Sequence, residues 1–316
     1  MKIAVLFPGQ GSQYLGMGRE FIETDSVCAA IMEQAEAVCD FPLRQLCIEG
    51  PMEELTRAIH LQPAITVTNL ICWQALQNSW GGKIGASCFA GHSLGEYSAL
   101  CAAGVLSVED TMRLVAKRGM LMEREGQKHP GAMRAVLGLS IGDIEGMIAQ
   151  CADAGVATVA NYNTEQQIVI SGEVAALDAV GGIAAERGAR IIPLAVSVAN
   201  HSPLVADAVP DFSTFMAEVE FNRPQIPVYF NVLAATEEEP AMIREIMARQ
   251  IASRVRWFEL IQAMIGQGVD TFIEVGPKTV LKGMIRKIAP KGYVYQALQL
   301  DTPDSLKQCL EQLGMN

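Results

Sequence analysis

Residues 85–104, GASCFAGHSLGEYSALCAAG, contain the pattern that decides the fold. Residues 85–90 form an apolar run of strand length, and a helical pattern follows the next glycines. Between them lies GHSLG (91–95), a G-x-S-x-G sequence. A serine on a tight strand-to-helix turn presents its hydroxyl at the carboxyl end of the strand. The stretch therefore predicts an α/β protein with Ser93 as a candidate nucleophile, although a glycine-rich chain also produces this pattern by chance.

Strand-like and helical segments alternate on both sides of this stretch. An apolar run at 2–7 (KIAVLF) is typical of a buried strand, and helical patterns begin near Ser26, at Pro63 and at Ser107. Pro63 stands where a first helical residue is expected. The alternation resumes after residue 203. This order predicts an α/β fold with a large, hydrolase-like core around a mostly parallel sheet.

Residues 131–197 follow a different order. Helical patterns separate strand-like runs in the sequence β-α-β-β-α-β, which is the order of a ferredoxin-like split βαβ unit. The segment has the size of an inserted subdomain, and GQKHPGA before it and ANHSP after it are typical of crossing points. We therefore predict a large α/β hydrolase-like core made of residues 1–130 and 198–316, with a small ferredoxin-like (βαββαβ) subdomain at 131–197.

The composition argues against nucleic acid and membranes as partners. The 316 residues include 24 Lys and Arg against 35 Asp and Glu, a formal charge of −11, whereas phosphate binding needs a concentrated cationic face. No window approaches the roughly 18 consecutive apolar residues that a membrane helix needs. The eight cysteines are scattered, without a C-x-x-C pair or a histidine at metal-ligand spacing. This usage predicts free thiols, no metal site and a reducing cytoplasmic location.

A serine hydroxyl needs a base, and the chain has four histidines. His92 is adjacent to Ser93, and adjacent residues on a sharp turn point apart. His60 and His129 lie in turn-like contexts, where we expect them to be solvated. His201 follows an apolar strand at the boundary between subdomain and core, where a loop can reach back over the sheet edge. By elimination His201 is the candidate base, and a loop histidine without a role is the alternative.

Two further polar residues have positions that suit a pocket. Arg118 lies in a helical pattern with mostly apolar neighbours; it faces solvent or, if it faces a pocket, suits a bidentate carboxylate. Gln10 lies in the loop PGQGSQ (8–13) after the first strand, near the edge where ligands of α/β proteins bind. This loop is no dinucleotide site, because Tyr14 stands where the third glycine is required.

Together these segments resemble the malonyl-CoA:acyl-carrier-protein transacylase family over almost the whole chain. The motifs occur in the order of the family, and their number makes chance agreement negligible. The matching segments are FPGQGSQ (7–13), LQPA (61–64), GHSLGEYSAL (91–100), KRGMLM (117–122), NYNTEQQIVISG (161–172), VSVANHSPL (196–204), VRW (255–257) and EVGPKTVL (274–281).

The resemblance implies a role for each matching residue. Ser93 would be the nucleophile and His201 its base. Gln10 and the backbone N–H of Leu94 would form the oxyanion hole. Arg118 would pair with the free carboxylate of a malonyl group.

The resemblance also implies less direct roles. Gln167 would line the pocket, and the backbone carbonyl of Ser253 would orient the histidine, because no acidic side chain completes a triad in this family. Asn200, a candidate substrate-binding residue, stands where many members have phenylalanine, so selectivity against methyl-branched groups is less firmly implied. Lys278 stands where glycine is common and adds a charge near the expected entrance.

The implied activity is a ping-pong transfer of malonyl from malonyl-CoA to the phosphopantetheine thiol of acyl carrier protein. It would proceed through a malonyl-serine, without a cofactor, and supply fatty-acid or polyketide synthesis. A serine acyl hydrolase acting on acyl-CoA or acyl-carrier thioesters is the alternative, because water can replace the thiol. A non-catalytic scaffold that binds carrier protein is a third possibility. The cation at Arg118 favours the transferase over a hydrolase of neutral acyl chains.

A basic segment near the C-terminus suggests where the carrier protein docks. Lys278, Lys282 and Arg286 recur every four residues in a predicted helix over 278–289, so they are expected to share one helical face. Carrier proteins are generally acidic, and this face would complement them. A solvated helix flank is the alternative.

Overall fold

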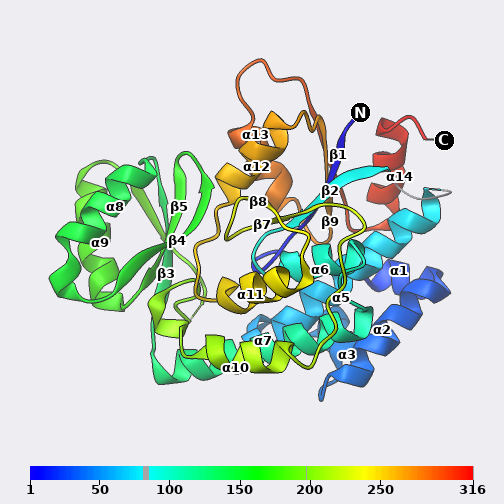
Figure 1. Ribbon diagram of the computed structural model, residues 1–316, viewed down its shortest axis with the longest axis horizontal. Helices are drawn as coiled ribbons and strands as arrows, with labels where there is room; N and C mark the ends of the chain where they lie inside the picture. Colours follow the sequence, from blue (N-terminus) through cyan, green and yellow to red (C-terminus); the bar gives the residue numbers. More distant parts are fainter. Residues whose placement is uncertain (81–84, 197, 316) are drawn as a thin grey trace.

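The computed structural model describes residues 1–80, 85–196 and 198–315 (Figure 1). The strands of its large sheet, in spatial order, are β10 (Gln296–Leu300), β9 (Thr271–Val275), β1 (Ile3–Phe7), β2 (Ala86–Gly91), β7 (Val228–Phe230) and β8 (Ala235–Thr236). Every neighbouring pair is parallel except β7 with β8. The predicted α/β class and mostly parallel sheet are therefore confirmed.

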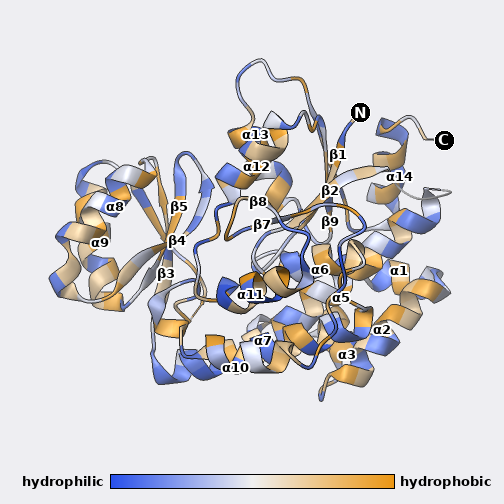
Figure 2. Ribbon diagram, viewed as in Figure 1, coloured by the Kyte–Doolittle hydropathy of each residue, from blue (hydrophilic) through white to orange (hydrophobic). Residues whose placement is uncertain are grey.

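Helices cover both faces of this sheet. Their bounds are α1 (Arg19–Thr24), α2 (Ser26–Val38), α3 (Leu43–Glu49), α4 (Met52–Thr56), α5 (Ala58–Ser79), α6 (Gly95–Ala102), α7 (Val108–Lys128), α10 (Ala208–Met216), α11 (Pro240–Gln250), α12 (Trp257–Gly266), α13 (Val280–Ile288) and α14 (Pro303–Gln312). Figure 2 shows helices such as α2 and α10 with hydrophobic and hydrophilic residues side by side, as expected for helices that bury one face. No helix in the described ranges is long and apolar enough to cross a membrane.

Strand β1 lies at the centre of the sheet, and its residues explain the layers. All of them are buried. Because side chains alternate across a strand, Ile3, Val5 and Phe7 join the apolar cluster that contains residues of α2, α5, α6 and α7. Ala4 and Leu6 join the opposite cluster, which contains residues of α12 and α13. A parallel strand buried on both faces reads as a continuous apolar run, as it does here.

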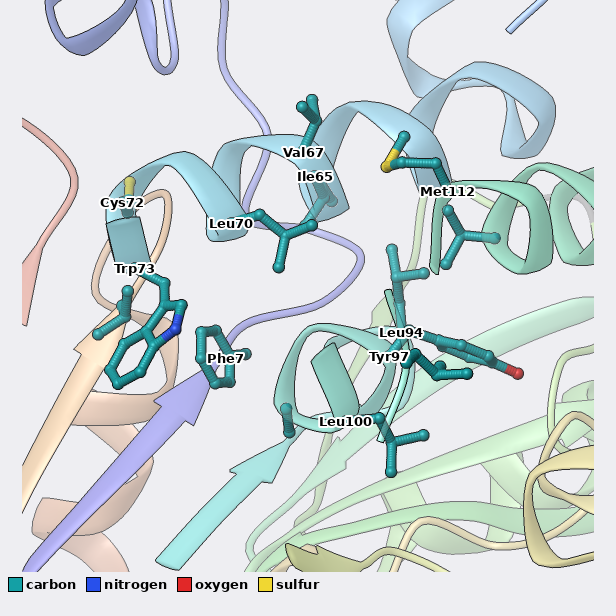
Figure 3. Close-up of a cluster of buried hydrophobic side chains, with 14 of the residues drawn as sticks. Phe7, Ile65, Val67, Leu70, Cys72, Trp73, Leu94, Tyr97, Leu100 and Met112 are labelled. Atoms are coloured by element: carbon teal, nitrogen blue, oxygen red, sulfur yellow. The ribbon is translucent and has the colours of Figure 1, made fainter. Parts of the chain in front are cut away.

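Helix α5 begins earlier than the sequence predicts. It starts at Ala58 and contains Pro63 in its interior, so the prediction that Pro63 is the first helical residue is wrong. Proline lacks the N–H that would bond one turn back, which weakens a helix. Burial compensates for this loss, because α5 packs against α2 and α7 along its length. Figure 3 shows Trp73 of this helix beside Phe7 of β1, with ring centroids 6.2 Å apart.

A second sheet forms a separate layer at the left of Figure 1. Its strands, in spatial order, are β4 (Ala157–Thr164), β5 (Gln167–Gly172), β3 (Ala132–Leu137) and β6 (Arg190–Pro193), and all neighbouring pairs are antiparallel. Helices α8 (Ile141–Gln150) and α9 (Val174–Glu186) pack on one face of this sheet. This order and pairing are those of a ferredoxin-like unit, as predicted.

The two crossing segments between the sheets lie side by side, because Pro130 and Val198 form an antiparallel bridge. The chain thus enters and leaves the small sheet at one place. We propose residues 1–130 and 198–316 as the large domain and 131–197 as the inserted subdomain. The boundary residue 197 lies outside the described residues.

Candidate active site

Ser93 lies on the turn between β2 and α6, at the carboxyl edge of the large sheet. Its φ of 50° is in the left-handed region, an unfavourable conformation that the surroundings must hold. Glycine is required on both sides of the turn. A Cβ at Gly91 would lie 1.9 Å from the carbonyl carbon of Gly95, and a Cβ at Gly95 would lie 2.0 Å from the carbonyl oxygen of Phe7. The close packing of this turn against β1 therefore fixes where the serine hydroxyl points.

His201 faces this hydroxyl from the loop that returns to the core. Its Nε2 lies 2.7 Å from Oγ of Ser93. Its Nδ1 lies 2.9 Å from the carbonyl oxygen of Ser253 and 3.1 Å from that of Gln250. Carbonyl oxygens only accept, so Nδ1 donates to them and Nε2 keeps the lone pair that faces the serine. Backbone carbonyls thus occupy the place that a carboxylate has in a Ser-His-Asp triad.

The surroundings keep this imidazole neutral. Burial, followed by the positive charge of Arg118, lowers the pKa of His201 from its usual 6.5 to about 3. Because this folded-state pKa lies below the physiological range, Nε2 remains free to accept a proton at pH 5 to 8.

We expect ¹⁵N NMR of histidine-labelled protein to show His201 as the neutral Nδ1–H tautomer, without titration over this range. Arg118→Ala should raise the midpoint, and a midpoint between pH 6 and 7 in the unsubstituted protein would contradict this prediction.

Arg118 of α7 lies beside the nucleophile and is only 2% exposed. Its Nη2 donates to Oγ of Ser93 at 3.2 Å and to Oε1 of Gln250 at 3.1 Å, and its Nη1 donates to Oε1 of Gln62 at 2.8 Å. Its Nε has no hydrogen-bond partner among the described residues. Burial lowers the pKa of this guanidinium, yet arginine stays charged in proteins. Since both amide acceptors are neutral, the hydrogen bonds that hold this guanidinium do not neutralise its charge.

A cavity of about 250 Å³ lies in front of Ser93 and His201, between the large sheet and the small one. Gln10, Asn200 and Gln167 line it, so the structure brings these predicted residues to the nucleophile. A second cavity of about 630 Å³ is also lined by Gln10 and Asn200 and adjoins the first. The two cavities share Gln10, Val196 and Asn200 in their linings, so they lie side by side.

Two other predicted residues lie at the edges of the site. Leu94 directly follows Ser93, and its side chain is buried beside Tyr97 in the core (Figure 3). Lys278 lies in the loop before α13, with φ 65°, and its Nζ donates to the carbonyl of Gly11 at 3.2 Å. The prediction that Lys278 shares a helical face with the basic residues that follow is therefore wrong, because α13 begins only at Val280.

The remaining histidines have other partners. His92 is partly buried and lines the same cavity as Ser93. Its Nε2 lies 2.8 Å from Oδ1 of Asn163. His60 lies inside α5 and packs on Phe41 with ring centroids 4.6 Å apart, so the prediction of a solvated turn is wrong for this residue. His129 is exposed at the end of α7, as expected.

Two side chains that hold the nucleophile turn have no local signal in the sequence. Oδ1 of Asn231 accepts from the backbone N–H of Ser93 at 2.7 Å, and its Nδ2 donates to the carbonyl of Gly91 at 2.8 Å. Nε2 of Gln250 donates to the carbonyl of Ser93 at 2.7 Å. These residues are 138 and 157 positions from Ser93 in sequence, so no local pattern connects them. The only nearby signal was the VRW motif, shortly after Gln250.

Potential metal ligands gather outside this site. Among the described residues, one group of His and acidic side chains has its ligand atoms within 4.8 Å of one another: Glu125, His129 and Asp207. Lys128 Nζ lies 3.6 Å from Glu125 and 3.9 Å from Asp207. This ammonium pairs with both carboxylates, and Arg124 also pairs with Glu125 at 2.6 Å, so the group carries no argument for a metal.

Comparisons with known proteins agree with this geometry. The sequence pattern of the family described as "Acyl transferase domain" matches residues 5–296. A malonyl CoA-acyl carrier protein transacylase of Bacillus subtilis is 36% identical over 314 residues, which is 99% of this chain and 97% of the relative. An acyl carrier protein S-malonyltransferase structure from Vibrio cholerae matches with TM-score 0.91 and 36% identity, covering 98% of this chain and 99% of that one. A chain from the structure of a type II polyketide acyl-carrier protein in complex with its malonyl-transacylase matches with TM-score 0.93 and 35% identity. The match covers 99% of this chain and 100% of that one.

The α/β core with a Ser–His pair at the carboxyl edge of its sheet defines an enzyme class, the serine-dependent acyltransferases. Within that class, the chain belongs to the malonyl CoA-acyl carrier protein transacylase family.

Proposed function

We propose that this chain transfers a malonyl group from malonyl-CoA to the phosphopantetheine thiol of acyl carrier protein, through a malonyl-Ser93 intermediate. The observation that carries the proposal is the buried guanidinium of Arg118, whose Nη2 is 3.2 Å from the nucleophilic oxygen. A malonyl group has a carboxylate one methylene beyond its acyl carbonyl, and this carboxylate can pair with Arg118 while the carbonyl meets Ser93. The transfer supplies extender units for fatty-acid or polyketide synthesis.

The first half-reaction loads the serine. Nε2 of His201 takes the Ser93 proton while Oγ attacks the thioester carbonyl carbon of malonyl-CoA. The backbone N–H of Leu94 and the side chain of Gln10 stabilise the oxyanion, and one such donor is typically worth about 2.7–4 kcal/mol in the transition state. The carbon–sulfur bond then breaks, and CoA leaves as a thiol with the proton from His201.

The second half-reaction unloads the serine. The phosphopantetheine thiol gives its proton to His201 and attacks the ester carbonyl, and Oγ of Ser93 takes the proton back as the ester bond breaks. Arg118 holds the malonyl carboxylate in both halves, which keeps the reacting carbonyl in one orientation. Asn200 and Gln167 line the cavity around the acyl chain.

This chemistry uses side chains and backbone groups of the chain alone. Ser93 supplies the nucleophile and His201 the base, so the proposed reaction needs no resident cofactor or metal. All eight cysteines are free thiols. Free thiols are typical of a reducing compartment, and we propose a cytoplasmic location.

The test of this function is intact-mass spectrometry after brief incubation with malonyl-CoA. We expect an adduct of one malonyl group that persists in buffer and disappears when carrier protein with its phosphopantetheine arm is added, with the malonyl group recovered on the carrier. Rapid loss of the adduct to water without carrier protein would instead support the acyl hydrolase. Absence of any adduct would support a non-catalytic scaffold and overturn the proposal.

We further propose that Lys282 and Arg286 of α13 dock the acidic carrier protein, together with Lys278 before the helix. The same helix lines the active-site cavity through Leu281, so a carrier bound here would have its arm near the nucleophile.

Reversal of both helical charges, Lys282→Glu with Arg286→Glu, should raise KM for carrier protein about three- to tenfold. Malonyl-enzyme formation from malonyl-CoA should not change, because that step involves no carrier. Lys307→Glu, an exposed charge reversal on α14, is the matched control. An unaltered KM in the double variant would refute the docking role.

A further inference from the structure

Glu96 is a buried carboxylate that the proposed reaction does not use. It lies in the first turn of α6 with no exposed surface. Its Oε1 accepts from the backbone N–H of Asn231 at 2.7 Å, and its Oε2 accepts from Nε2 of Gln250 at 2.5 Å. Burial raises the pKa of Glu96 to about 7, while these two donors and the charge of Arg118 act in the opposite direction. A carboxylate is costly to bury, so its presence three residues after the nucleophile requires a reason.

The contacts of Gln250 provide that reason. Its Nε2 donates both to Glu96 and to the carbonyl oxygen of Ser93, at 2.7 Å from the latter. The Ser93 carbonyl can only accept, and so can the ionised carboxylate of Glu96. The amide nitrogen must therefore face them, and the amide oxygen must face the other way. That oxygen, Oε1, accepts from Nη2 of Arg118 at 3.1 Å.

We propose that Glu96 is a positioning residue that sets the preference for a carboxylate-bearing acyl group. Together with the Ser93 carbonyl it fixes the orientation of the Gln250 amide, and the oriented amide holds Nη2 of Arg118 beside Oγ of Ser93. This inference rests on the proposed function, because it assumes that Arg118 binds the malonyl carboxylate.

The intervening amide also explains why the carboxylate is not placed directly on the arginine. Arg118 is held by two amide oxygens, those of Gln250 and Gln62. Neutral acceptors orient the guanidinium without forming an ion pair with it. A carboxylate in direct contact would neutralise the cation and compete with the malonyl group. Glu96 acts on the guanidinium through Gln250, so it orients Arg118 without pairing with it. The positive charge of Arg118 is then left for the carboxylate of the substrate.

The test is Glu96→Gln, with transfer to carrier protein measured from malonyl-CoA and from acetyl-CoA. The oxygen of the new side chain would stay on the backbone N–H of Asn231, which leaves its NH₂ group facing the NH₂ group of Gln250. These two donors repel each other and displace the Gln250 amide, which weakens its contact with Arg118. We expect the ratio of malonyl to acetyl kcat/KM to fall about tenfold or more, since one hydrogen bond to a charged group is lost. A purely structural role predicts an equal fall for both substrates, and that result would overturn the proposal. Glu109→Gln, an exposed position on α7, should leave both rates unchanged.

A second variant keeps the proposal testable if Glu96→Gln does not fold. Gln250→Met removes the amide and keeps Glu96, and it should lower the same ratio. When both variants fold, the double variant should lower the ratio no further than Gln250→Met alone, because both substitutions act on one contact. An unchanged ratio in Gln250→Met, or an additive fall in the double variant, would overturn the inference.

Arg118→Ala separates this inference from the function on which it rests. If Arg118→Ala abolishes the preference for malonyl while Glu96→Gln and Gln250→Met keep it, the positioning role is wrong and the proposed function stands. If Arg118→Ala itself keeps the preference, Arg118 does not bind the malonyl carboxylate, and the part of the proposed function on which this inference rests fails.

Discussion

Replacement of Ser93 by alanine is expected to abolish the malonyl-enzyme adduct and to lower malonyl transfer by about 10⁴-fold or more. The substitution removes the only atom that His201 can activate at 2.7 Å, while the oxyanion donors and the arginine stay in place. The fold should survive, because alanine needs the same backbone turn and loses only the hydroxyl. Intact-mass spectrometry with malonyl-CoA and a steady-state transfer assay would measure the two effects.

The matched control is Ser213→Ala, an exposed serine on α10, which should form the adduct at the normal rate. Loss of the thermal melting transition would identify a Ser93→Ala variant that does not fold. In that case His201→Ala, which removes the base of the Ser93–His201 pair, would be assayed in its place. An adduct that forms normally in a folded Ser93→Ala protein would mean that another residue carries the acyl group.

The nucleophile turn could be predicted from sequence because local sterics dictate it. A serine between Gly91 and Gly95, after a strand and before a helix, leaves few arrangements in which a Cβ would not collide. The small sheet was equally predictable, because alternating apolar runs and helical patterns specify a ferredoxin-like order without any distant contact.

The rest of the site depends on tertiary contacts that no local pattern carries. Gln250 ends α11, a helix with an ordinary amphipathic pattern, and its contacts with Ser93 arise only when the chain closes over the sheet. Pro63 was misplaced for the same reason: its local preference for a helix start is overridden by the packing of α5. Lys278 continues the regular charge spacing of the residues after it, but its own backbone is in the left-handed region. The helix therefore begins only at Val280.

Arg118→Ala should lower malonyl transfer by about 10²- to 10³-fold, equivalent to about 3–4 kcal/mol, and acetyl transfer by less than tenfold. The malonyl carboxylate would lose its cationic partner in a buried site, whereas an acetyl group has no carboxylate to leave unpaired. Because the charge of Arg118 contributes to the low pKa of His201, its removal also makes the imidazole a stronger base. That change acts on both substrates alike and cannot restore the difference between them.

Arg113→Ala is the matched control for this prediction. Arg113 lies on the same helix, but its side chain pairs with Asp110 at 3.1 Å and does not reach the serine. We expect both substrates to react with this variant at their normal rates. Kinetics with malonyl-CoA and acetyl-CoA side by side then give the decisive quantity, the ratio of the two losses in Arg118→Ala. Equal losses would mean that the guanidinium only supports the packing around Ser93, and the selection of a carboxylate-bearing acyl group would have to come from elsewhere in the cavity.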